Sequence, residues 1–271
     1  MAVISTNIAA MRAHNSSRIA DKTLANSMER LSTGKRINSA KDDAAGLALA
    51  SKLSARIAGV NQTVRNANDG ISAAQIGEGA MSEIANILTR LRELAVQSAS
   101  GTMSNTDRAN TVVLEATALT AQITNIAAQT EFNGVALLGA DTTLSIQTGL
   151  ATGQTSAVLF KGMTLTLIGI NAIDLTTAAN ASTALGLVDT GITYVATARS
   201  TLGSAQAGLE TVVNNQTINA LNTSEAKSRI EDADFSVESS RLASAQIIAQ
   251  AATAMLAQAN QSQQGVLNLL R

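Results

Sequence analysis

Apolar residues recur with a helical period over most of the chain. From residue 53 to residue 95 they are spaced by three, four or seven, as in a seam between packed helices. The members of this stripe are Leu53, Ile57, Val60, Val64, Ala67, Ile71, Ala74, Met81, Ile84, Leu88, Leu91 and Ala95. We therefore expect one long helix over residues 45–99, about 80 Å in length at a rise of about 1.5 Å per residue.

Two more stripes supply helical partners. The stretch SGTMSN at 100–105 interrupts the first pattern, and Asp107 is a candidate cap for the helix that follows. The second stripe comprises Val112, Ala116, Leu119, Ile123 and Ile126, and the third comprises Ile192, Val195, Leu202, Ala205, Leu209 and Val212. Because a helix with one apolar face needs other elements to cover it, the sequence predicts a helical bundle.

A different pattern lies between the second and third stripes. Residues 142–149 and 163–169 alternate apolar and polar side chains, which is typical of strands, and Asn133-Gly134 is a turn signal. We expect a few hairpins at one end of the bundle. The alternative is an irregular loop, because glycines punctuate residues 149–162.

Both chain ends carry apolar heptads. Residues 242–270 contain no charged side chain, yet their many amides argue against a membrane span. Since chain ends fray unless they are tied down, we expect the two ends to pair and to bury their remaining faces against other copies. The alternative, a self-contained antiparallel coiled coil, normally carries more charge on its outer positions. The expected polymerisation core comprises Ile4, Ile8, Met11, Leu24, Met28, Leu31, Leu242, Leu256, Val266 and Leu270.

Composition restricts the class of protein. The 271 residues include no proline, four aromatic side chains, no cysteine and one histidine, His14. Few aromatics and no proline favour an elongated, mainly α protein: a long helical bundle or coiled coil formed by both chain ends, with a small β-hairpin region in the middle. With no cysteine and a single histidine, the chain lacks the usual ligands of a metal or cofactor and the usual residues of an enzyme's active site. A net charge of −1 argues against a nucleic-acid partner.

The stretch 31–53 interrupts two apolar stripes and raises the question of a binding site. A phosphate-binding loop ending at Gly34-Lys35 would need Gly at 29 and a hydroxyl at 36, but Glu29 and Arg36 stand there. Adjacent acids on a helix point about 100° apart, so Asp42 and Asp43 are no catalytic pair. We interpret the stretch as a joint, in which Gly34 relaxes the backbone and Ser39, Asp42 and Asp43 cap a new helix.

A second joint is expected at 228–242, where acids cluster before an aromatic residue. If the terminal helices pair, the two joints meet. The basic side chains of the first joint then lie opposite the acidic side chains of the second, within one subunit or between subunits. The bases are Lys35, Arg36 and Lys41, the acids are Glu231, Asp232 and Asp234, and Phe235 is the expected anchor.

Six motifs follow one another along the chain: RLSTGKRINSAKDDAAGLALASKL (30–53), RNANDGISAAQIGEGAMSEI (65–84), LTRLRELAVQSASG (88–101), QTEFNGVALL (129–138), SRIEDADFSVESSRL (228–242) and the closing VLNLLR. In this order they resemble the motifs of bacterial flagellin. The resemblance covers roughly the first 175 and the last 80 residues.

The resemblance implies a filament subunit for swimming, exported unfolded by the flagellar type III route and assembled at the distal tip outside the cell. The start of the chain lacks a cleavable secretory signal, which fits that route. Residues 1–44 and 227–271 would form the filament core and its spokes, and residues 45–226 the outer tube, with the variable region reduced to about 176–190. The implied partners are further copies, an export chaperone, and cap and junction proteins.

The resemblance also implies a contact for a host flagellin-sensing Toll-like receptor. The matching positions are Arg90, Leu94, Gln97 and Glu115. Two alternatives remain: these residues contact a neighbouring protofilament, or, for Leu94, simply continue the core stripe. A hook-filament junction protein is the other class considered, but its central motifs are expected to diverge, whereas RELAVQ and EFNG are intact here.

Overall fold

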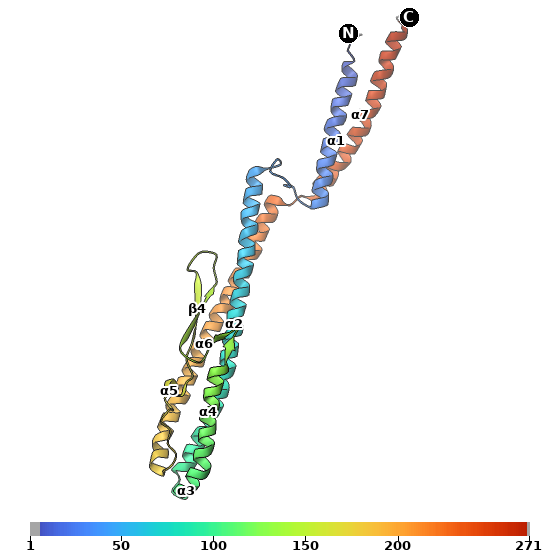
Figure 1. Cartoon of the computed structure of the whole chain (residues 1–271). Coiled ribbons are helices and arrows are strands. Elements are labelled where there is room, and N and C mark those ends of the chain that lie inside the picture. Colours follow the sequence, from blue (N-terminus) through green and yellow to red (C-terminus); the bar gives the residue numbers. More distant parts are fainter. Residues whose placement is uncertain (1–5, 270–271) are drawn as a thin grey trace. The chain divides into compact units, whose positions relative to one another are not determined.

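The computed structural model describes residues 6–269, and they are mainly helical, as expected (Figure 1). The helices are α1 (Ile8–Thr33), α2 (Ala44–Ala99), α3 (Asn105–Asp107), the π-helical turn η1 (Arg108–Val112), α4 (Val113–Gln129), α5 (Leu165–Ile168), α6 (Ala178–Glu231) and α7 (Phe235–Leu269). The strands are β1 (Glu131–Phe132), β2 (Val135–Ala136), β3 (Thr142–Gln147) and β4 (Thr155–Phe160).

The chain forms two compact units. Residues 1–57 and 221–271 form one, which contains α1, α7 and the segments that link them to α2 and α6. Residues 58–220 form the other, which contains most of α2 and α6 together with α4 and both hairpins.

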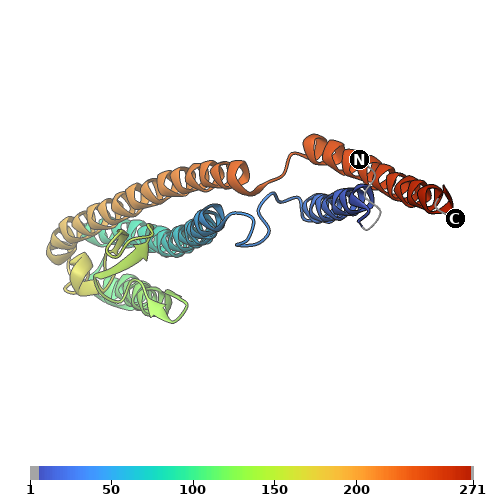
Figure 2. The same cartoon turned by 90° about the horizontal axis from the view of Figure 1, so that it is seen from above.

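The unit of residues 58–220, whose ribbon Figure 2 shows from above, has a continuous apolar core to which α2, α4 and α6 contribute. The three predicted stripes line it, and the fully buried members include Met81, Leu88, Leu91, Ile123, Val195 and Leu202. The expected long helix is confirmed at Ala44–Ala99. Burial of each large side chain contributes roughly 1.5–3 kcal/mol, so these helices stabilise one another chiefly through this core.

The cap after the long helix differs from the expected one. Ser104, not Asp107, caps α3, because its Oγ accepts a hydrogen bond from the Asp107 backbone N–H at 3.1 Å. The buried Arg108 guanidinium then donates to the carbonyls of Ser98 and Ser100 at 2.7 and 2.6 Å. The turn between α2 and α4 is therefore held by one cap and one buried arginine.

Two hairpins confirm the predicted β region, but the second strand lies elsewhere than expected. Strand β1 pairs with β2 around a turn in which Asn133 and Gly134 have φ of 50° and 78°. Strand β3 pairs with β4 antiparallel, from Thr142 opposite Phe160 to Gln147 opposite Thr155. The expected strand at 163–169 is wrong, since those residues contain the single helical turn α5.

The apolar alternation at 163–169 fits a short helix as well as a strand. Thr164 caps α5 through its side chain, and Gly169 ends it in the left-handed conformation at φ of 85°. A single turn satisfies the backbone groups locally, and capping residues at both ends favour it over strand pairing.

The longer hairpin packs closely against α2. A Cβ added at Gly77 would lie 2.9 Å from Cε1 of Phe160, whose side chain is fully buried. Glycine in the middle of a helix costs roughly 1 kcal/mol relative to alanine, and this close approach explains its presence.

Candidate functional site

Helices α1 and α7 pack antiparallel along each other and form the terminal helix pair (Figure 1). Their buried residues repeat at intervals of seven: Ala13, Ala20 and Ser27 on α1, and Glu238, Ala245, Ala252 and Ala259 on α7. Small side chains let two helix backbones approach closely, but they bury little apolar area. The predicted pairing of the chain ends is therefore present, through a seam made largely of alanine.

The predicted polymerisation core divides between two faces. Leu24, Leu31, Leu242 and Leu256 are half-buried and flank the alanine seam. The exposed members are Ile8, Met11 and Met28, at 49%, 65% and 57%. Ile4, Leu270 and the Val266 side chain lie outside the described residues. The exposed side chains are available for contact with other molecules.

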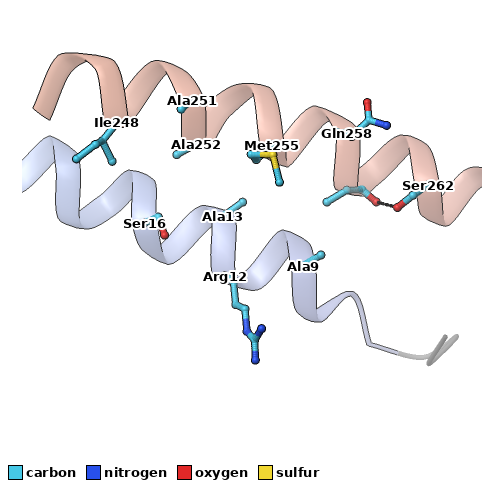
Figure 3. A pocket seen from close by; sticks show the side chains of 11 residues that line it. Ala9, Arg12, Ala13, Ser16, Ile248, Ala251, Ala252, Met255, Gln258 and Ser262 are labelled. Carbon is cyan, nitrogen blue, oxygen red and sulfur yellow. Dashed lines mark hydrogen bonds between the residues drawn. The ribbon is translucent and has the colours of Figure 1, made fainter. Parts of the chain in front are cut away.

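An open groove runs along one side of the terminal helix pair (Figure 3). It has a volume of about 650 Å³, its walls come from residues 9–16 and 248–262, and a smaller depression adjoins it beyond Ile248. Ile248 and Met255 line the groove and are 49% and 62% exposed, whereas the rest of its lining is mostly alanine and serine. Among the described residues, no helix is long and apolar enough to cross a membrane. Because small side chains let helices approach closely, this uncovered apolar groove is a surface on which another helix could pack.

The joint, residues 34–43 and 231–234, links this helix pair to α2 and α6. Gly34 ends α1 in the left-handed conformation at φ of 70° and donates to the Arg30 carbonyl at 2.9 Å. Its own carbonyl accepts from the Ala233 N–H at 2.9 Å, and Lys35 forms an antiparallel bridge with Asp232. The two predicted joints therefore meet through backbone hydrogen bonds.

Charge pairing in the joint centres on Glu231. Its carboxylate is 2.5 Å from Nζ of Lys35 and 3.5 Å from Nζ of Lys227, and the residue is only 6% exposed. The hydrogen bond from Lys35 holds the pKa of Glu231 below its ordinary value, and the same bond raises the pKa of Lys35. One of the expected pairings between base and acid is thus present in the subunit.

The other bases and acids of the joint act differently from expectation. Arg36 donates to the Ile230 carbonyl at 2.7 Å instead of to a carboxylate. Lys41 forms no ion pair within residues 6–269. Asp234 caps α7 by accepting from the Ser236 N–H at 2.8 Å. Phe235 is 71% exposed, so it anchors nothing within the described part of the subunit.

Of the three predicted caps of α2, only Asp43 caps the helix, whereas Asp42 binds the turn before it and the Ser39 hydroxyl donates to Asp42. Asp42 accepts from the N–H and the hydroxyl of Ser39, both at 3.0 Å, and these bonds lower its pKa. Asp43 accepts from the Gly46 N–H at 2.9 Å, which is the N-cap geometry for a helix that begins at Ala44. The two carboxylates therefore order the backbone on either side of the bend.

The four residues implied as a receptor contact lie on α2 and α4. Arg90 pairs with Glu115 across the two helices at 2.8 Å and with Glu93 at 2.9 Å, which raises its pKa. Gln97 also lies on α2, seven residues after Arg90, and is exposed. Leu94 is only 2% exposed and belongs to the core. The structure thus presents Arg90, Gln97 and Glu115 on the surface, whereas the Leu94 side chain lies in the core.

The seam also contains a polar pair that the spacing of apolar residues does not reveal. Ser27 donates to Glu238 at 2.6 Å in a position where both side chains are buried. The signal was present, because Ser27 extends the seven-residue spacing of Ala13 and Ala20, and Glu238 extends that of the α7 alanines. A search for apolar residues alone passes over both.

A helical bundle joined to a thin terminal helix pair with an open apolar groove defines a self-associating structural subunit. Residues 4–143 match the family model of the bacterial flagellin N-terminal helical region, and residues 185–270 match that of the C-terminal helical region. The chain is 41% identical to a flagellin of Halalkalibacterium halodurans over 99% of this chain and all of the relative, and 37% identical to a flagellin of Bacillus subtilis over 99% of each. The crystal structure of Bacillus cereus flagellin covers 56% of this chain and 88% of its own, with 30% identity and a TM-score of 0.50. This chain belongs to the bacterial flagellin family.

Proposed function

We propose that this chain is the structural subunit that polymerises into the bacterial flagellar filament for swimming. The observation that carries the proposal is the groove on the terminal helix pair, an apolar surface that a single subunit leaves open. Family membership supports the same function, since the relatives are flagellins along their whole length. The filament lies outside the cell, and the chain acts in it as a structural protein and not as an enzyme.

The family also supports the route and the placement in the filament. The subunit would leave the cell unfolded by the flagellar type III route, with an export chaperone, and would fold at the distal tip in contact with cap and junction proteins. Residues 1–44 and 227–271 would form the filament core with its spokes, and residues 45–226 the outer tube.

The test is seeded assembly. Purified full-length chains are added to short filament fragments of the same protein, and electron microscopy follows their length. We expect extension of the seeds at one end by chains that form no filament without seeds. Chains that are folded by circular dichroism yet never extend the seeds would contradict the proposal.

Before assembly, the terminal helix pair should be much less stable than the bundle. Its seam consists mainly of alanine, whereas the bundle buries Met81, Leu88 and Leu91 completely, and local stability follows buried apolar contact. We expect faster amide hydrogen exchange in residues 1–40 and 235–271 of the monomer than in residues 53–95, because the helix pair forms but opens more often than the bundle. The measurement is mass spectrometry on a sample verified as monomeric. Equal protection of both regions would show that the pair is stable without other copies.

We propose that the exposed surface around Arg90 contacts a neighbouring protofilament. The ion pair with Glu115 holds the guanidinium between α2 and α4, where a partner can reach both charges. The host flagellin-sensing Toll-like receptor is a second candidate for the same surface, because the exposed residues Arg90, Gln97 and Glu115 match the positions implied by the family resemblance.

Replacing Arg90 by alanine separates these roles. Arg90 is 49% exposed in its side chain, so we expect a change in bundle stability within about 0.5 kcal/mol. An interface arginine often contributes about 2 kcal/mol or more, so cells with the variant should have shorter or straighter filaments and swim more slowly. Receptor signalling by the monomer is measured separately, and Lys52→Ala is the matched control for loss of one exposed base on α2. Normal motility together with full signalling would contradict both the protofilament contact and the receptor contact of Arg90.

A further inference from the structure

The register of the terminal helix pair follows from two long-range hydrogen bonds. The Asn7 amide donates to the Ala259 carbonyl at 3.2 Å, and the Ser27 hydroxyl donates to the Glu238 carboxylate at 2.6 Å. Moving along α1 by twenty residues thus corresponds to moving back along α7 by about the same number. Ala20 therefore lies opposite Ala245, and Ala13 opposite Ala252.

The alanines alone do not distinguish this register from a shifted one. Because they repeat every seven residues on both helices, a slip of one heptad, about 10 Å, again places alanine opposite alanine. In one slipped register Ala13 faces Ala245, with the same side-chain size and the same apolar character as the native pair. Packing of the seam alanines, taken by themselves, is therefore nearly degenerate.

Within the helix pair, the polar pair distinguishes the two registers, in addition to the backbone hydrogen bond between Gly34 and Ala233 in the joint. Glu238 is 4% exposed, and its carboxylate accepts from Ser27 and lies 3.3 Å from Arg241 and 3.7 Å from Arg30. Slipping by one heptad would place this carboxylate against Ala20, without the serine hydroxyl. Burying a carboxylate that has lost its hydrogen-bond donor destabilises the slipped register, whereas alanine packs against alanine equally well in both registers.

We propose that Ser27 and Glu238 set the register of α1 against α7, and that through this register they align the two walls of the groove for assembly. The proposal extends the proposed function, because it assigns positioning residues to the same assembly surface. The hydrogen bond from Ser27, together with the charges of Arg30 and Arg241, holds the pKa of Glu238 below its ordinary value, so the carboxylate is charged at neutral pH.

A disulfide between introduced cysteines tests the register directly, since the chain has no cysteine of its own. The pair Ala13→Cys with Ala252→Cys reports the native register, and Ala13→Cys with Ala245→Cys reports the slipped one. A shift of about 10 Å exceeds the separation that a disulfide spans. Each pair is measured in the full-length monomer and in seeded filaments, without further change and with Glu238→Ala.

We expect the native cross-link to dominate in the otherwise unchanged chain. Glu238→Ala should lower the ratio of native to slipped product at least about tenfold, which corresponds to about 1.4 kcal/mol. Glu238→Gln, which keeps an acceptor for Ser27, should largely restore the ratio. Ser27→Ala should lower it as well, and the exposed Ser32→Ala is the matched serine control, expected to leave it unchanged.

An unchanged ratio in both Glu238→Ala and Ser27→Ala would overturn the proposal and leave the joint as the element that sets the register. The monomer measurement keeps this result separate from the proposed function. If unaltered chains fail to extend seeds, the filament proposal fails, whereas the cross-link in the monomer still tests the register.

Discussion

Replacing Ile248 by lysine should block filament growth at concentrations that suffice for the unaltered chain and leave the bundle of residues 58–220 folded. Ile248 lines the groove at 49% exposure, so in the filament it would be covered by another copy. Burial of an isoleucine contributes roughly 1.5–3 kcal/mol, and a lysine there would also have to lose its hydration. We expect the critical concentration for seeded growth to rise at least about 100-fold, since each 1.4 kcal/mol is about tenfold.

The matched control at this position is Ile248→Leu, which keeps apolar volume and should assemble nearly as the unaltered chain does. Met255→Lys, in the same groove, should repeat the effect of Ile248→Lys. Circular dichroism and hydrogen exchange of residues 53–95 check that the bundle is intact. Normal seed extension by both lysine variants would show that the groove remains open to water in the filament.

Replacing Leu91 by alanine should weaken the bundle itself. Leu91 is fully buried among α2, α4 and α6, and truncating such a leucine leaves a cavity that costs about 2–5 kcal/mol. For a unit of this size the unfolding temperature should fall by roughly 4–20 °C. Differential scanning calorimetry of the monomer measures the shift.

Leu114→Ala is the matched control for this change. Leu114 lies on α4 in the same bundle but is 71% exposed, so its loss should change the unfolding free energy by no more than about 0.5 kcal/mol. Equal shifts for the two leucines would contradict the core described for residues 58–220. Together with the Ile248 variants, the pair distinguishes residues needed to fold one subunit from residues needed to join many.

The long helices followed from periodicity because their stripes are uniform. Met81, Leu88 and Leu91 recur at helical spacing over an uninterrupted run without proline, and no competing structure buries them as well. The joint could be predicted equally well, since Gly34 favours a left-handed helix end and Asp43 favours a helix start. These features depend on local chemistry, which a single sequence contains.

The second strand of the long hairpin was harder to predict from the sequence. Residues 155–160 and 163–169 both contain apolar residues at strand-like positions, and only the pairing of Thr142 with Phe160 and the contact of Phe160 with Gly77 select the first. Strand choice is a non-local matter, because it depends on which surface the strand covers.

The sequence by itself determined that this is a mainly helical protein with apolar heptads at both ends, a joint beside each and the motifs of a flagellin. These properties depend on the spacing of apolar residues and on local capping residues. Only the tertiary structure decided which face of each terminal helix is used within the subunit. Alanines form the internal seam, and larger residues such as Met11 and Ile248 stay exposed. The physical reason is that a heptad defines stripes along a helix, whereas the antiparallel register, set across more than two hundred residues by contacts such as Ser27 with Glu238, decides which stripe a partner covers.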